Sequence, residues 1–173
     1  KSDHIIFGSF NEIKKINDSV IKIWSNILCQ VPNSKLFLIS YKFNDNEFKS
    51  LFIEKFLNKD VKINQLIFEN GCDRKALLSK YNLIDIALDT FPYNGGTTTL
   101  EALWMCVPTL VMKGRSFLSK CGESINISLG LNDWIAENND DYIWKAINFS
   151  KNIDKIQKTK SYLINNRNKF KIF

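Results

Sequence analysis

The stretch LDTFPYNGGTTTLEALWMCVPTLVM, residues 88–112, decides how this chain folds. It contains an apolar segment, a loop with two glycines and three threonines, a helix-like run and a second apolar segment. The order strand, loop, helix, strand is typical of a βαβ unit, in which the two strands lie parallel. Adjacent glycines in such a loop indicate that a ligand or another segment approaches the backbone closely.

The same alternation of strands and helices extends to both sides of this unit. Asp18 and Asp73 are candidate N-caps of two of the helices. We expect helices at 18–31, 44–59, 72–82, 97–106, about 119–128, 131–136, 140–152 and about 153–167. We expect strands at 4–10, 35–40, 63–69, 84–90 and 108–113.

This alternation predicts an α/β fold, a Rossmann-like parallel sheet with helices on both faces. The chain has 173 residues and shows no shift in composition, so we expect a single domain over residues 1–173. We expect a polar C-terminal helix or tail over residues of approximately 153–173. This segment either packs back on the domain or extends away from it. The sequence leaves these two possibilities open.

The composition narrows the classes of protein to consider. Apolar residues make up 45% and charged residues 24% of the chain, which is typical of a soluble globular protein. No run of about 18 apolar residues is present, so no membrane span is expected. The net charge of +6 is compatible with nucleic-acid binding, but we favour a solvated helix face, because the aromatic residues have core spacing.

Cysteine and histidine usage limits the chemistry. None of the four cysteines forms a CxxC pair, so we expect free, buried thiols in a reducing compartment, and hence a cytoplasmic location. The single histidine, His4, excludes a multi-histidine metal site and disfavours a Ser-His-Asp triad.

The glycine and threonine loop is a candidate anion site. It follows a strand and opens a helix, and ligands of open parallel sheets bind beyond the carboxyl ends of the strands. Gly95 and Gly96 leave room for a ligand, and Thr97 and Thr98 offer hydroxyls beside the free N–H groups of the helix, which suits a diphosphate. Alternatively, Gly-Gly is a turn and one of the threonines is a plain N-cap, since neither GxGxxG nor GKS is present.

Glu101 lies one turn into the same helix, among apolar neighbours. A carboxylate there could accept hydrogen bonds from the ribose hydroxyls of a nucleotide whose phosphates bind at the helix start. Alternatively, it only complements the helix dipole. An unpaired carboxylate among apolar side chains is costly, which favours a role in ligand binding.

Residues 88–112 resemble the donor-binding half of protein O-linked N-acetylglucosamine transferases, the SPINDLY/O-GlcNAc transferase family. Segments 7–38 and 114–146 are similar to other parts of that family in the same order. The resemblance implies a GT-B fold, of which this chain would be the C-terminal half. It also implies an inverting transfer of a sugar from UDP to Ser or Thr of proteins, without a bound metal or other cofactor. The sugar expected is N-acetylglucosamine. The acceptor-side half and the TPR repeats that usually precede it would lie outside this chain, so the chain alone is expected to be inactive.

The resemblance also implies roles for individual residues. Lys15 matches the lysine that neutralises the donor diphosphate, and Glu12 matches a glutamine that contacts the donor. Thr97 and Thr98 match the threonine pair at the phosphates. Glu101 replaces the ribose-binding aspartate and keeps its charge. Without the resemblance, Lys15 would be interpreted as a solvated loop lysine beside a second lysine.

Other positions of the motif carry a base contact or depart from the family pattern. Arg74 matches a lysine near the uracil, and the backbone of residues 71–74 would face the base. The family has histidine at Gly96 and at Leu77, and arginine at Lys120. The loss of both histidines is compatible with weaker donor binding or with a different nucleotide or sugar. It is also compatible with an alternative hypothesis, a non-catalytic binding or scaffold module derived from the same family.

Overall fold

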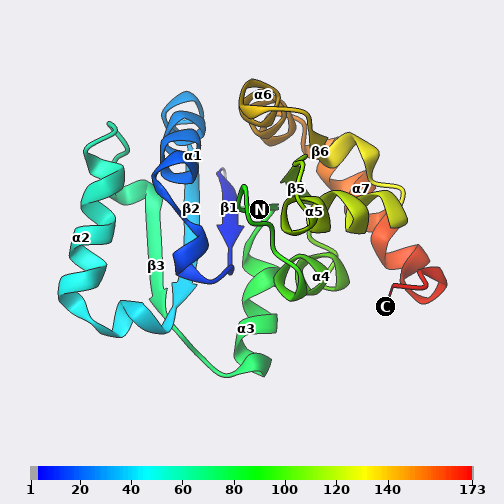
Figure 1. The fold of residues 1–173 in the computed structure, drawn as a ribbon, viewed down its shortest axis with the longest axis horizontal. Coiled ribbons are helices and arrows are strands. Elements are labelled where there is room, and N and C mark those ends of the chain that lie inside the picture. The colour runs from blue at the N-terminus through cyan, green and yellow to red at the C-terminus, as the bar shows by residue number, and fades with distance from the viewer. Residues whose placement is uncertain (1–3, 173) are drawn as a thin grey trace.

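The computed structural model describes residues 4–172, so residues 1–3 and 173 of the expected domain lie outside the described residues. Six parallel strands form one sheet in the order β3-β2-β1-β4-β5-β6 (Figure 1). This confirms the predicted Rossmann-like parallel sheet. The strands are β1 (Ile5–Ser9), β2 (Ser34–Ser40), β3 (Leu66–Asn70), β4 (Ile86–Leu88), β5 (Thr109–Met112) and β6 (Ile135–Ala136).

Helices cover both faces of the sheet, as predicted. The helices α1, α2 and α6 pack together on one face, whereas α3 and α4 lie on the other face (Figure 1). The helices are α1 (Asp18–Gln30), α2 (Asn46–Leu57), α3 (Arg74–Lys80), α4 (Thr97–Trp104), α5 (Phe117–Ser128), α6 (Asn139–Ser150) and α7 (Ile153–Asn166). Among residues 4–172, no helix is long and apolar enough to cross a membrane.

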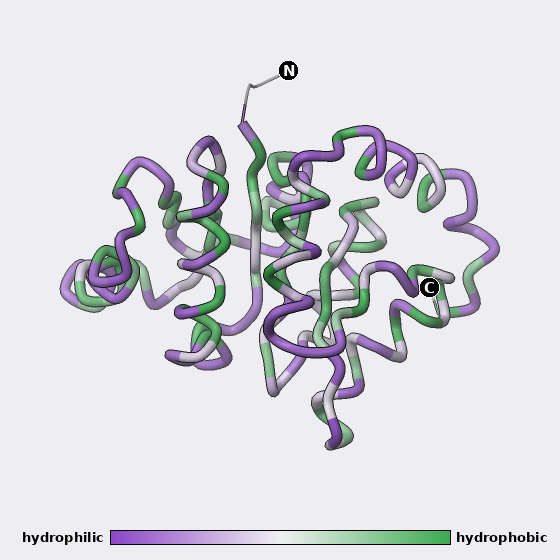
Figure 2. Tube along the Cα trace, turned by 90° about the horizontal axis from the view of Figure 1, so that it is seen from above, coloured by the Kyte–Doolittle hydropathy of each residue, from purple (hydrophilic) through white to green (hydrophobic). Residues whose placement is uncertain are grey.

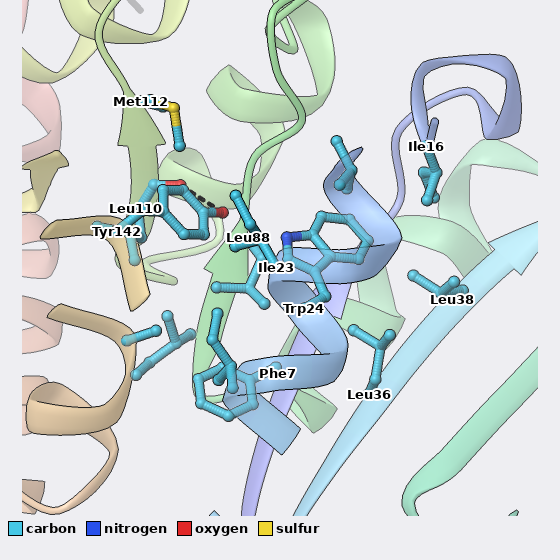
Figure 3. Packing of buried hydrophobic residues seen from close by; sticks show 14 of the residues in the cluster. Phe7, Ile16, Ile23, Trp24, Leu36, Leu38, Leu88, Leu110, Met112 and Tyr142 are labelled. Carbon is cyan, nitrogen blue, oxygen red and sulfur yellow. Dashed lines mark hydrogen bonds between the residues drawn. The ribbon is translucent and has the colours of Figure 1, made fainter. Parts of the chain in front are cut away.

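The larger core lies between the sheet and the helices α1, α2 and α6. Trp24 of α1 is fully buried and packs against side chains of β1, β2 and β4 (Figure 3). Tyr142 of α6 enters the same layer, and its hydroxyl donates a hydrogen bond to the carbonyl oxygen of Asp89 at 2.9 Å. Burial of one large apolar side chain of this kind contributes about 1.5–3 kcal/mol, so this layer contributes strongly to stability.

The helices are amphipathic, which explains why they pack on the sheet. Hydrophilic and hydrophobic stretches alternate along their traces (Figure 2). The C-terminal helix α7 follows the same rule, since Ile156 and Leu163 are buried while Ile164 is exposed. Of the two possibilities left open for the terminal segment, the structure shows that α7 packs back on the domain, against α6.

Several local predictions were wrong. Residues 131–136, expected to be helical, form a short 3-10 turn (Asn132–Trp134) followed by the edge strand β6. The N-cap of α1 is Asn17 and not Asp18, because the Asn17 side chain accepts a hydrogen bond from the N–H of Val20. All four cysteines are free, but only Cys106 is buried.

The strand order places the candidate site. β1 and β4 are neighbours at the centre of the sheet, and the order of the strands reverses between them. Segments that follow two such strands leave the sheet in opposite directions, which opens a crevice where ligands bind. Here the segments are residues 10–17, after β1, and residues 89–96, after β4. Every predicted site residue except Arg74 lies in these two segments or in α4.

Candidate functional site

The start of α4 presents free backbone donors. Gly96 is the N-cap residue, and among the described residues no side chain accepts a hydrogen bond at this cap. The first N–H group to bond within the helix is that of Leu100, which donates to the carbonyl oxygen of Gly96 at 3.0 Å. The N–H groups of the first turn therefore have no intrahelical partner, and the helix dipole favours an anion in front of them. Thr97 and Thr98 are not plain N-caps.

The two glycines of the loop have different environments. A Cβ atom on Gly95 would lie 2.5 Å from Thr99 Oγ1, 2.7 Å from Thr98 Oγ1 and 2.8 Å from Asn11 Oδ1. A Cβ atom on Gly96 would have no atom within 4 Å. Gly95 is therefore needed for packing within the protein, whereas Gly96 borders open space at the cap of α4.

Lys15 brings a positive charge to this loop. It ends the 3-10 helix η1 (Ile13–Lys15) that follows β1, and its Nζ donates a hydrogen bond to the carbonyl oxygen of Asn94 at 2.9 Å. The ammonium also lies 3.9 Å from the centre of the Tyr93 ring, an attractive cation–π geometry. An ammonium has three N–H donors, so binding to Asn94 leaves it able to contact an anion. The predicted proximity of Lys15 and the glycine loop is therefore found.

A buried carboxylate lies beneath the loop. Asp89 follows β4, and its Oδ1 accepts hydrogen bonds from the N–H of Gly95 at 2.7 Å, the N–H of Thr90 at 2.8 Å and Nδ2 of Asn11 at 3.1 Å. Burial raises the pKa of Asp89 from 3.8 to about 6, although these hydrogen bonds and the charge of Lys15 act in the opposite direction. Asp89 therefore holds the loop in place and is ionised at neutral pH.

Arg74 and Glu101 form an ion pair, with Arg74 Nη2 at 3.0 Å from Glu101 Oε1. The Glu101 side chain is 11% exposed, whereas that of Arg74 is 72% exposed. The structure thus brings together the two residues that were predicted to contact the base and the ribose. It also corrects the argument from an unpaired carboxylate, because Glu101 is paired in this structure.

Glu12 and Leu77 make fewer contacts with the other predicted site residues. Glu12 is exposed at the start of η1, and among residues 4–172 no hydrogen bond or ion pair joins its side chain to another predicted site residue. Its carbonyl oxygen accepts a hydrogen bond from the N–H of Lys15 at 2.9 Å. Leu77 packs against the smaller core between the sheet and α3.

Two polar residues of the site, Asn11 and Asp89, were missed as site residues. Asn11 follows β1 and Asp89 follows β4, and both are buried. A signal was present in the sequence, because each is a polar residue at the end of an apolar run. Their partnership could not be predicted without the strand order, which makes β1 and β4 neighbours.

A separate hollow lies on another part of the described surface. It measures about 680 Å³ and is bounded by residues 130–134 and α7. Two of its charged groups pair with each other, since Lys155 Nζ lies 2.8 Å from Asp133 Oδ2. The reversal of strand order and the polar side chains around it mark the candidate site better than volume does, because one domain holds only part of a site that lies between two domains. Among residues 4–172, no cluster of three or more metal-ligating side chains of the His, Cys, Asp and Glu types is found.

Comparison with known proteins places this geometry in a family. A family model described as glycosyl transferase family 41 matches residues 1–173. The chain belongs to this family. A curated relative, the probable UDP-N-acetylglucosamine–peptide N-acetylglucosaminyltransferase SPINDLY of Arabidopsis thaliana, is 34% identical over 164 residues, which are 92% of this chain and 18% of the relative. The UDP-N-acetylglucosamine–peptide N-acetylglucosaminyltransferase of Caenorhabditis elegans is 28% identical over 88% of this chain and 13% of the relative.

A solved structure agrees with this family 41 assignment. A single-residue mutant of the O-GlcNAc transferase of Thermobaculum terrenum is 30% identical, with a TM-score of 0.92 over 95% of this chain and 32% of that chain. The likeness confirms that the sheet and helices are those of a GT-B glycosyltransferase. The chain spans about a fifth or less of the length of these curated relatives.

Proposed function

We propose that this family 41 chain is the donor-binding domain of an inverting, metal-independent protein O-glycosyltransferase that uses a UDP-sugar, by preference UDP-N-acetylglucosamine. The observation that carries the proposal is the position of Lys15. Its ammonium is held 2.9 Å from the Asn94 carbonyl oxygen, beside the loop that opens α4. A cation and a set of free N–H groups therefore face one crevice from two neighbouring strands.

The donor fits this arrangement in one orientation. The diphosphate binds the N–H groups at the start of α4 and the ammonium of Lys15. The ribose then lies one turn along the helix, where Glu101 keeps one carboxylate oxygen for its hydroxyls while the other pairs with Arg74. The base lies over residues 71–74, at the start of α3. The open space in front of Gly96 leaves the phosphates unobstructed.

The chemistry follows from charge. When the sugar leaves UDP, negative charge accumulates on the diphosphate in the transition state. Donors that are already in position stabilise this charge without reorganisation, which is the largest effect in many enzymes. Lys15 is the residue we assign to this catalytic role, and the proposal requires no metal, since the cation and the helix N–H groups supply the positive field.

Sugar transfer to Ser or Thr also needs an acceptor site and a proton acceptor. We propose that an acceptor-side half elsewhere in the full protein, together with TPR repeats, provides the acceptor site, and that residues 1–173 are a single donor domain of this cytoplasmic enzyme. The names of the relatives, peptide N-acetylglucosaminyltransferases, support transfer to a peptide acceptor. The isolated chain should bind UDP weakly and transfer no sugar.

Replacement of two neighbouring lysines tests the proposal. Lys15→Ala should weaken UDP binding about tenfold or more, because a charge-assisted contact to phosphate is worth about 1.5–3 kcal/mol. Lys14→Ala is the matched control, since Lys14 is the adjacent, exposed lysine. Calorimetric titration of the chain and both variants with UDP measures the effect. Equal affinities of the two variants would contradict the proposal.

The second hypothesis, a non-catalytic module, is favoured by Gly96 and Leu77, which stand where the family has histidines. In that case the domain would fold normally and show no preference for a nucleotide. Lys15→Ala in the full-length protein would then leave its cellular role unchanged. Loss of sugar transfer on the same substitution would exclude this hypothesis.

A further inference from the structure

Thr98 was expected to offer its hydroxyl to a phosphate, but its contacts point to another role. Its Oγ1 lies 2.6 Å from Oδ1 of Asn11, in the segment after β1. Nδ2 of the same Asn11 side chain donates a hydrogen bond to Oδ1 of Asp89 at 3.1 Å. One chain of hydrogen bonds thus joins the end of β4, the segment after β1 and the first turn of α4.

The direction of each bond in this chain is fixed by the carboxylate. An ionised carboxylate only accepts hydrogen bonds, so Asn11 must turn its NH₂ group toward Asp89. Its amide oxygen, which also only accepts, then faces Thr98. The Thr98 hydroxyl must therefore donate its single proton to Asn11. A phosphate oxygen is likewise an acceptor, so the Thr98 hydroxyl has no proton left to give to it.

The surrounding contacts hold this chain in place. Asp89 Oδ2 accepts from Thr99 Oγ1 at 3.3 Å, and the Tyr81 hydroxyl donates to the carbonyl oxygen of Thr98 at 3.1 Å. Asn11, Asp89 and Thr99 are all buried. Each side chain in this series of hydrogen bonds thus has a defined partner on a different element. These partners limit the movement of the first turn of α4.

We propose that Asp89 and Asn11 are positioning residues, which commit the Thr98 hydroxyl to the protein and so aim the backbone N–H groups at the start of α4 toward the diphosphate. This inference rests on the proposed function. It reassigns Thr98 from a direct ligand of the phosphate to an anchor of the helix start. Contact with the phosphates then falls to the N–H groups, to the exposed Thr97 and to Lys15.

A double-mutant cycle with UDP distinguishes the two roles of Thr98. Thr98→Val removes the hydroxyl and keeps the shape, and Asn11→Ala removes its partner. Each change should weaken UDP binding about tenfold at pH 8, and the double variant should be no weaker than either single one, because both break the same link. Additive losses of about a hundredfold would show that the hydroxyl contacts the ligand itself and would overturn the inference.

Two further measurements distinguish failure of the positioning role from failure of the proposed function. Thr98→Ser should restore the affinity to within about twofold, since serine supplies the same hydroxyl. In the ligand-free chain, Thr98→Val should shift the side-chain NH₂ signals of Asn11 in a ¹H–¹⁵N NMR spectrum. Unchanged Asn11 signals would overturn the hydrogen-bond chain without any use of UDP. Absence of UDP binding by the unsubstituted chain would overturn the proposed function and with it the positioning role.

Discussion

At the scale of single residues, Asp89 is the least expected feature of the site. Its carboxylate is fully buried and has no ion-pair partner among the described residues, although the charge of Lys15 lowers its pKa somewhat. Hydrogen bonds from Gly95, Thr90 and Asn11 stabilise the ionised form but do not fully offset its loss of water. Asp89 is thus a costly residue that orders the segments around the site.

The stability of the protein should depend on pH through Asp89. The folded-state pKa is about 6 and the ordinary value is 3.8, so between these values the folded protein binds more protons than the unfolded chain. The free energy of unfolding should therefore fall as pH rises from about 4 to about 6, by about 3 kcal/mol from this group, and then level off.

Urea unfolding at pH 4.5 and 7.5 measures this effect, and Asp89→Asn should remove that part of the pH dependence. The other ionisable groups near Asp89 are Lys15, Tyr81 and Tyr142, and burial raises the pKa of both tyrosines, so neither titrates in this range. Asp18→Asn, at an exposed site, is the control. An identical pH dependence in Asp89→Asn and the unsubstituted chain would refute the prediction.

The sequence predicted which residues lie near one another better than it predicted their partners. The resemblance assigned candidate roles to Lys15, Thr97, Thr98, Arg74 and Glu101. The structure brings Lys15 to the glycine loop and pairs Arg74 with Glu101. The partners of these side chains could not be predicted, since they depend on distances between segments far apart in the chain. Thr98 with Asn11, 87 positions away, is the clearest case.

At the scale of elements, the loop between β4 and α4 is the decisive unit. Its two glycines look alike in the sequence, but only Gly95 lies against the side chains of Thr98, Thr99 and Asn11. Neither glycine has a positive φ, so conformational freedom does not distinguish them. The difference lies in packing, and packing is not visible in a sequence.

Replacement of each glycine by alanine should reveal this difference. Gly95→Ala should destabilise the protein by about 1–3 kcal/mol, because its methyl group overlaps polar atoms that are held by hydrogen bonds. Gly96→Ala should change the stability by less than about 1 kcal/mol. Thermal unfolding of the two variants compares them directly. Equal melting temperatures would contradict the packing described for the loop.

Element boundaries were predicted best where the hydrophobic periodicity extended over many residues. The helix expected at 18–31 is α1 (Asp18–Gln30), and the helix expected at 140–152 is α6 (Asn139–Ser150). The error at 131–136 has a physical cause. Six residues are too few to separate helical from strand periodicity, and β6 is a two-residue strand fixed by its pairing with β5.

At the scale of the whole molecule, the strand order explains why distant segments form one site. Because β1 and β4 are neighbours at the reversal point, the segment with Lys15 and the loop with Gly95 share one crevice. The alternation of elements predicted a parallel sheet, but it did not predict this order. The order is fixed by tertiary packing, in which α1 and α6 meet on one face of the sheet.

The C-terminal helix should contribute to the stability of the whole domain. Leu163 of α7 is buried in the main core, whereas its neighbour Ile164 is 60% exposed. Leu163→Ala should lower the free energy of unfolding by about 2–4 kcal/mol, and Ile164→Ala, the matched control, by less than about 0.5 kcal/mol. Urea unfolding measures both. Equal effects would indicate that α7 does not pack as described.

In the proposed function, the cap of α4 and Lys15 together bind the diphosphate of a nucleotide. The most direct test is a titration of the ¹⁵N-labelled chain with UDP, followed by ¹H–¹⁵N NMR. Binding at this place should produce the largest shifts at residues 95–101 and at Lys15. Shifts confined to the hollow at residues 130–134 and α7, or no shifts at millimolar UDP, would contradict it.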